Sequence, residues 1–263
     1  MTYLERLEQR VGPLPDWHYY DPDGLEYLLH TPNICEALFK IGDVFHTYAN
    51  ARAALIFTDQ SDYGTLVDTN SSESECFVKA MFLQQALFGY NSCIDLSWQV
   101  LWLYYETKEL DLLLESDRYE KSLNGCNLET LNGRLIMAKD NKMKDFVLRF
   151  TGTESYQKIR EPYNYLKHRG AFHIPGLGYN EKYLPIGING DKLACFHRRE
   201  LIFVDWIENL VSFHHTFKEY FEVIINAVVP RYSEHPVNMN RALPYIQKII
   251  DYKEIKVSGC EDK

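Results

Sequence analysis

The stretch RELIFVDWIENLVSFHHTFKEYFEVIINAVV, residues 199–229, decides the fold class. Its apolar side chains recur at alternating steps of four and three residues, which is the period of one face of an α-helix. This stripe consists of Phe203, Ile207, Leu210, His214, Phe217, Phe221, Ile224 and Val228. Pro230 follows directly and cannot continue a helix. The pattern predicts a long helix over about 199–229 that packs on another helix.

A second long helix is predicted over about 73–107. Ser72-Glu-Ser-Glu75 has the capping-box pattern that begins a helix. Apolar side chains then occur on nearly all faces, as in a central helix surrounded by others. At about 1.5 Å per residue this helix would span roughly 50 Å, and we expect it to bend at Gly89.

Shorter helices are predicted on both sides of this pair. The first 57 residues contain an amphipathic segment at 3–11 and a second helix at 32–57, where Thr31-Pro32 supplies the cap and the first residue. A last helix is predicted at about 237–252. We therefore expect a single all-α domain over residues 1–263, in which the N-terminal and C-terminal helices pack on the two long ones.

The remaining segments carry turn signals. Residues 122–153 contain two Asn-Gly dipeptides, and we favour short helices there because nothing nearby alternates as a sheet partner would. Glycine and proline recur from about 170 to 198, which predicts a long structured loop. A small hairpin is expected within it, around Ile188-Asn-Gly-Asp191.

Composition and charge exclude several classes of protein. The 263 residues are 46% hydrophobic and 25% charged, which is typical of a globular chain. The net charge of −9 disfavours an electrostatic hold of the whole protein on nucleic acid or anionic lipid. The most apolar stretch, residues 77–105, contains too many polar side chains for a membrane span, so no membrane partner is expected.

The cysteines and the N-terminal sequence indicate a cytoplasmic location. The six cysteines are scattered, and no Cys-x-x-Cys pair occurs, which argues against a zinc knuckle and against a thioredoxin-type motif. We interpret them as reduced thiols. The first ten residues alternate charged and apolar types, which predicts no signal peptide.

A basic segment stands out within this acidic chain. Residues 139–169 carry a net charge of +4, which leaves −13 for the rest. On a helix, Asn164, Lys167 and His168 would share one face, and Arg160 would lie one turn earlier on the same side. Arg169 and His173 follow at the helix end, where Gly170 is a suitable cap. Such a region can bind phosphate locally.

These residue types fit RNA cleavage without a metal or cofactor. A histidine can take the 2′-hydroxyl proton and return one to the leaving oxygen. An arginine can stabilise the charge that builds on the phosphate, and nearby tyrosines can stack on bases. We predict Arg160, His168, Arg169 and His173 as catalytic residues, with substrate contacts from Asn164, Lys167, Arg198 and Arg199. The alternative is that a basic helix end merely complements the helix dipole.

The segment Asn164-Tyr-Leu-Lys-His-Arg169, in a chain with a long central helix, resembles HEPN-type (higher eukaryote and prokaryote nucleotide-binding) helical domains. It is also similar to uncharacterised bacterial all-α proteins related to nucleic-acid-processing folds. The resemblance implies RNA or nucleotide handling. In active HEPN members an arginine is followed after four to six residues by a histidine, often at a dimer interface. Here seven residues separate Arg160 from His168, and three separate Arg169 from His173. Either the register differs or the nuclease chemistry is absent.

Other candidates are weaker. His215 and Glu219 stand at i and i+4 and could ligate one metal, but His214 lies on the apolar stripe and is expected in the core. No metal site is therefore predicted. The acidic group is interpreted as a solvated face; it consists of Glu106, Glu109, Asp111, Glu115 and Asp117.

Two functions remain open for the chain. One is RNA binding or processing, with RNA or another phosphate-bearing ligand as the partner. The other is a non-catalytic helical module that binds a partner protein or a small ligand. A homodimer fits both, because a long helix with a clean apolar stripe can extend an interface.

Overall fold

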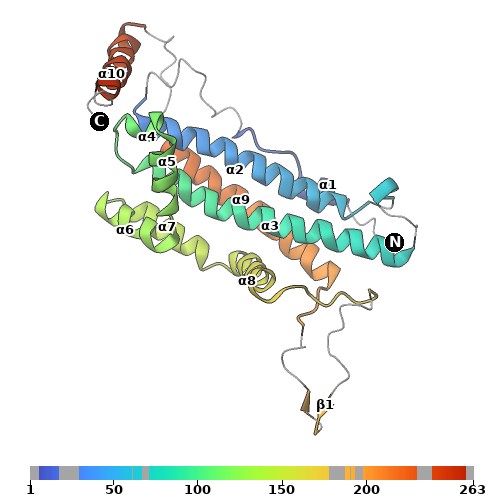
Figure 1. Ribbon diagram of the computed structural model, residues 1–263. Coiled ribbons are helices and arrows are strands. Elements are labelled where there is room, and N and C mark those ends of the chain that lie inside the picture. Colours follow the sequence, from blue (N-terminus) through green and yellow to red (C-terminus); the bar gives the residue numbers. More distant parts are fainter. Residues whose placement is uncertain are drawn as a thin grey trace. The chain divides into compact units, whose positions relative to one another are not determined.

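The computed structural model describes residues 6–17, 30–60, 62–66, 71–177, 187–189, 191–192, 198–229 and 239–258. These residues form an all-α fold, as predicted, and Figure 1 traces their order. The helices are α1 (Leu7–Val11), α2 (Pro32–Phe57), the 3₁₀ turn η3 (Gly64–Leu66), α3 (Ser72–Tyr104), α4 (Asp111–Leu114), α5 (Ser116–Asn124), α6 (Leu128–Met137), α7 (Asn141–Thr151), α8 (Glu154–Arg169), α9 (Phe203–Val228) and α10 (Met239–Ser258).

A two-residue antiparallel pair, β1 (Gly187–Ile188) and β2 (Asp191–Lys192), lies where the hairpin was predicted. Most of the remaining predicted loop, at residues 178–186 and 193–197, lies outside the described residues. The same holds for the start of the predicted helix at 3–11 and for residues 237–238 of the last one. The segment 122–153 forms the short helices α5 to α7.

The long helices differ in detail from the sequence expectation. Helix α3 has 33 residues and α9 has 26, and α2 equals α9 in length. Gly89, where a bend was expected, lies inside an uninterrupted α3. A Cβ on Gly89 would lie 2.7 Å from the Cβ of Ala51, so the missing side chain is what lets α3 approach α2 closely.

The chain divides into two compact units. Unit 1 comprises residues 1–14, 47–93 and 148–219, and unit 2 comprises residues 15–46, 94–147 and 220–263. Helices α2, α3 and α9 therefore contribute residues to both units. The single domain inferred from sequence stays a prediction. None of the described helices has the length and apolar character of a membrane span.

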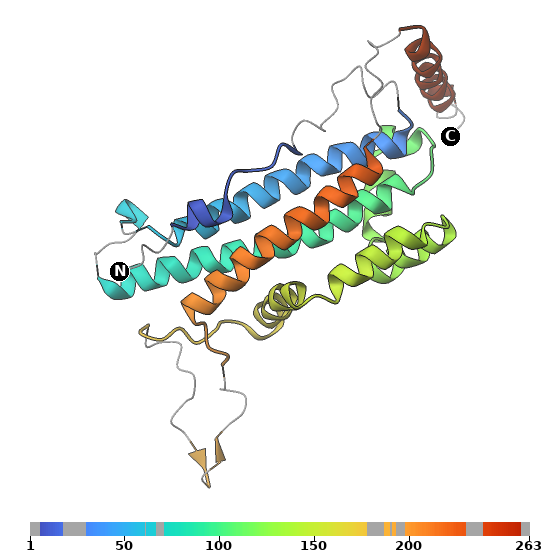
Figure 2. The same cartoon turned by 180° about the vertical axis from the view of Figure 1, so that it is seen from behind.

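In unit 1 the segments of α2, α3 and α9 run alongside one another in both views (Figures 1 and 2). Their facing side chains are fully buried aromatic residues, including Tyr48, Tyr90, Phe213 and Phe217. Phe213 and Phe217 stack with ring centroids 5.8 Å apart. The predicted apolar stripe of α9 is thus the core face of that helix, because only burial removes so much apolar surface from water.

Unit 2 corrects one interpretation of the sequence. The carboxylate of Glu106 is not on a solvated face, since its side chain is 8% exposed and lies 2.8 Å from Arg134 Nη1. Burial alone would raise its pKa, but hydrogen bonds from Ser122 and Arg134 lower the pKa of Glu106 to about 2. Arg134 also lies over the ring of Trp102. The acidic sequence run gave no signal that Glu106 is buried and paired, because its partners Ser122 and Arg134 come from other helices.

Candidate functional site

Helix α8 carries most of the predicted site residues, and its ends are well defined. Thr153 caps the start by accepting a hydrogen bond from the backbone N–H of Tyr156. Gly170 ends the helix with φ of 89°, a left-handed backbone conformation that favours glycine, and its N–H bonds to the carbonyl of Leu166. The chain therefore turns away from α8 directly after Arg169.

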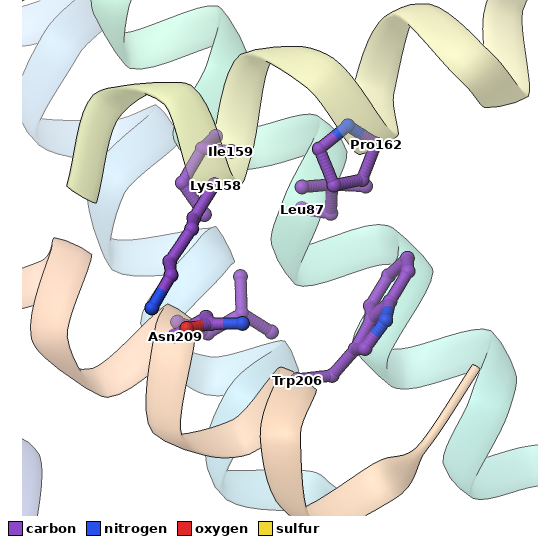
Figure 3. Close-up of a pocket in the computed structure, with 7 residues that line it drawn as sticks. Leu87, Lys158, Ile159, Pro162, Trp206 and Asn209 are labelled. Carbon is purple, nitrogen blue, oxygen red and sulfur yellow. The ribbon is translucent and has the colours of Figure 1, made fainter. Parts of the chain in front are cut away.

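Pro162 lies inside α8 and lines a small cavity. Proline has no N–H, so the carbonyl of Lys158 lacks its usual partner four residues on. Figure 3 shows the cavity between α8, α3 and α9, faced by Pro162, Leu87 and Trp206. Its volume of about 20 Å³ has room for about one water molecule. This cavity is therefore too small for a ligand.

A larger, open hollow lies along the C-terminal half of α8. Its volume is about 430 Å³, which is within the range of ligand sites. It is lined by Glu161, Asn164, Tyr165, His168, Arg169 and Arg199. The five residues from α8 follow helical spacing, so one face of the helix forms the floor. Four of the eight predicted site residues meet here, namely Asn164, His168, Arg169 and Arg199.

Arg199 reaches the hollow from a segment 30 residues further along the chain. The backbone N–H of His173 donates to the carbonyl of Arg199 at 2.8 Å, and that of Leu201 donates to the carbonyl of His173 at 2.8 Å. The guanidinium of Arg199 then lies 5.0 Å from the ring centroid of Tyr165 and 2.9 Å from the carboxylate of Glu161. These contacts fix the position of Arg199 beside α8.

The other four predicted residues do not line the hollow. Arg160 Nη1 donates to the buried Asn91 Oδ1 at 2.8 Å, which directs it to α3. Arg198 donates to the carbonyl of Ala171. His173 is half-buried and holds the chain by its backbone, and Lys167 is exposed on α8. The predicted face of Asn164, Lys167 and His168 is thus divided between the hollow and its surroundings.

Sequence reasoning missed Glu161 as a member of this site and considered Tyr165 only among the nearby tyrosines that can stack on bases. The signal for both was present, because positions 161, 164, 165, 168 and 169 share one helical face by spacing alone. Glu161 brings one negative charge to a hollow with two arginines. Within the described residues, the side chains of Arg169 and His168 form no hydrogen bond or ion pair.

The second histidine candidate, His214, lies in the core as predicted. It is 0% exposed, and its Nε2 lies 3.0 Å from the carbonyl of Val11 and 2.9 Å from the hydroxyl of Tyr48. Nδ1 lies 2.8 Å from the hydroxyl of Tyr90. A neutral ring with its hydrogen on Nε2 satisfies these contacts, since a carbonyl only accepts and Tyr90 can donate. Burial lowers the pKa of His214 to about 3, and the neighbouring His215 adds to this.

This histidine region also anchors α1. Three successive carbonyls at the end of that helix receive side-chain donors: Arg10 from His215, Val11 from His214, and Gly12 from Arg52. Such donors satisfy the carbonyls that every helix end leaves unpaired. Across the described ranges, no three histidine, cysteine or acidic side chains cluster in a way that could hold a metal. His215 contributes to this anchor, because its Nε2 lies 2.8 Å from the carbonyl of Arg10.

Comparison with protein-family models, with curated proteins and with solved structures finds no match for the chain. The geometry of the hollow is therefore the basis for a functional proposal.

Proposed function

We propose that the protein binds RNA, or a related phosphate-bearing ligand, in the hollow beside the C-terminal half of α8. The observation that carries the proposal is the meeting of Arg169, Arg199, His168, Asn164 and Tyr165 around one open space of about 430 Å³. Guanidinium groups match phosphate oxygens in pairs, and a tyrosine ring offers a face for a base. The net charge of −9 on the whole chain favours local over non-specific binding.

The same residues support a metal-independent cleavage step. His168 would take the proton of a 2′-hydroxyl, whose oxygen then attacks phosphorus, while the bond to the 5′-oxygen breaks and that oxygen receives a proton. Arg169 would stabilise the charge on the phosphate. Arg160 would then act indirectly, as a positioning residue bound to Asn91.

The resemblance of residues 164–169 to HEPN-type domains supports this proposal and extends it. Active sites of that group often lie across a dimer interface, so we include a homodimer in the proposal. We also include the cytoplasmic location that the cysteines and the N-terminal sequence indicate. The resemblance supports RNA over other phosphate-bearing ligands.

A second candidate is a non-catalytic module that docks a partner protein. It is favoured by an apolar stripe on α3 in unit 1, where Phe77, Met81 and Phe88 are 45%, 49% and 37% exposed. Exposed apolar side chains at helical spacing are typical of docking faces. If the protein is such a module, the hollow on α8 does not bind or cleave RNA.

A binding and cleavage assay with a fluorescent RNA oligomer pool, in the presence of a chelator, tests the first proposal. We expect Arg169→Ala to weaken binding about tenfold and to reduce the slope of log K against log salt by about 0.7, the value for one lost phosphate contact on a single strand. His168→Ala should keep most of the binding and lose the cleavage.

The matched control is Lys158→Ala, which removes one exposed positive charge from the same helix outside the hollow. We expect its affinity to stay within about twofold of the wild type. Equal loss in Arg169→Ala and Lys158→Ala would show a diffuse attraction rather than a site. Absence of salt-sensitive binding by the wild type would overturn the proposal and leave the docking module.

A further inference from the structure

Arg199 is the one predicted contact in the hollow that already holds an anion from its own chain. Its Nη1 lies 2.9 Å from Glu161 Oε1, while its guanidinium lies over the Tyr165 ring and its backbone N–H bonds to the Tyr165 hydroxyl at 3.1 Å. The guanidinium is thus held in place, with a carboxylate where a ligand oxygen would bind.

This ion pair is weak enough to exchange. The side chains of Arg199 and Glu161 are 48% and 66% exposed, and pairs in such surroundings contribute only about 0–1 kcal/mol because water screens them. A phosphate offers the guanidinium the same two-oxygen geometry as a carboxylate, with comparable or greater charge. The ligand can therefore replace Glu161 without the cost of breaking a buried pair.

The carboxylate also lowers the positive charge of the hollow. Arg169 and Arg199 bring two positive charges, and Glu161 offsets one of them. A lone phosphate that displaced Glu161 would leave that carboxylate beside it, and like charges at such distances repel. A ligand with several consecutive phosphates can bind Arg169 with one group and compete for Arg199 with the next.

We propose that Glu161 is an internal competitor for Arg199. Its carboxylate prevents small anions from binding Arg199, but the consecutive phosphates of an RNA strand displace it. Glu161 is then a specificity-determining residue of the site. The inference rests on the proposed function, because it assigns the hollow to a phosphate-bearing ligand.

The test compares Glu161→Gln with Glu154→Gln by fluorescence anisotropy on a labelled 12-nucleotide RNA, with inorganic phosphate as competitor. Glu154 is an exposed acid on the same helix that pairs with Lys158 at 2.8 Å, so its variant removes the same charge away from the hollow. We expect Glu161→Gln to bind RNA about fivefold tighter and to be displaced by phosphate at about tenfold lower concentration. Glu154→Gln should change both by less than twofold.

Glu161→Asp separates contact from charge, because it keeps the carboxylate but shortens the side chain by one methylene. We expect its phosphate sensitivity to fall between those of the wild type and Glu161→Gln. Equal behaviour of Glu161→Gln and Glu154→Gln, or no change in Glu161→Gln, would overturn this inference alone if Arg169→Ala still weakens binding. Absence of RNA binding by every variant, wild type included, would overturn the proposed function itself.

Discussion

Two histidines of unit 1 have opposite surroundings. His214 is fully buried, and its ring atoms and backbone carbonyl lie within hydrogen-bond distance of Tyr48, Tyr90 and Val11. His168 is exposed at the rim of the hollow, and within the described residues its ring has no partner. The first is held in one protonation state by burial, while the second is accessible to a ligand.

These surroundings determine which of the two histidines could act as a general acid–base. A general acid–base must reach the substrate and change its protonation state near the working pH. His214 fails on both counts, because its side chain is 0% exposed and burial keeps it neutral. Its hydrogen bonds instead join α9 to α2, α3 and the end of α1. We therefore assign His214 to stability, and the proposed acid–base role stays with His168.

The largest expected effect is on folding stability. We expect His214→Ala to lower the free energy of unfolding by about 3–5 kcal/mol, because it leaves a cavity and buried tyrosine hydroxyls without a partner. His168→Ala should change it by less than about 0.5 kcal/mol, as an exposed substitution does. Urea unfolding followed by circular dichroism measures both. Comparable losses in the two variants would remove the distinction between these regions.

The next effect is the pH dependence of stability. The pKa of His214 is about 3 in the folded chain, against an ordinary value of 6.5 for an unfolded one. The unfolded chain therefore binds more protons between these values, and stability falls as the pH drops through that window. Burial raises the pKa of Glu36, in unit 2, from 4.5 to about 7, although Lys40 opposes this. That group has the opposite sign, because stability falls as the pH rises from 4.5 to 7.

The contributions of His214 and Glu36 to the pH dependence of stability oppose each other when unfolding exposes both side chains. We expect the wild type to show a nearly flat profile of unfolding free energy between about pH 4.5 and 6.5. Glu36→Gln should reveal a rise of up to about 1.4 kcal/mol per pH unit from His214. Urea unfolding at a series of pH values measures the profile. A flat profile in Glu36→Gln would mean that His214 is not held neutral.

The smallest effect concerns a single hydrogen bond. Tyr90→Phe removes the donor to His214 Nδ1 and leaves that nitrogen buried without a partner, for an expected loss of about 1–2 kcal/mol. Tyr48→Phe is the matched comparison and should cost less, since Nε2 keeps the carbonyl of Val11. Thermal unfolding of the two variants measures the order. The reverse order would place the ring hydrogen on Nδ1 instead.

The helices themselves were predictable because their signals are local. The stripe from Phe203 to Val228 repeats at helical period, Thr153 and Gly170 stand where a helix begins and ends, and each of these signals depends on residues within a few positions. The core position of His214 followed from the same stripe. Local periodicity is thus sufficient to determine the all-α class and to place one histidine inside it.

The hollow was decided by tertiary structure. Sequence spacing put Asn164 and His168 on one face, but it could not bring Arg199 beside Tyr165 and Glu161, because that contact depends on a backbone pairing of residues 173 and 200. Spacing likewise gave no sign that Arg160 is held by Asn91, 69 positions away in the chain. The sequence alone determined which faces the helices bury, and only packing between distant segments decided which charges share one space.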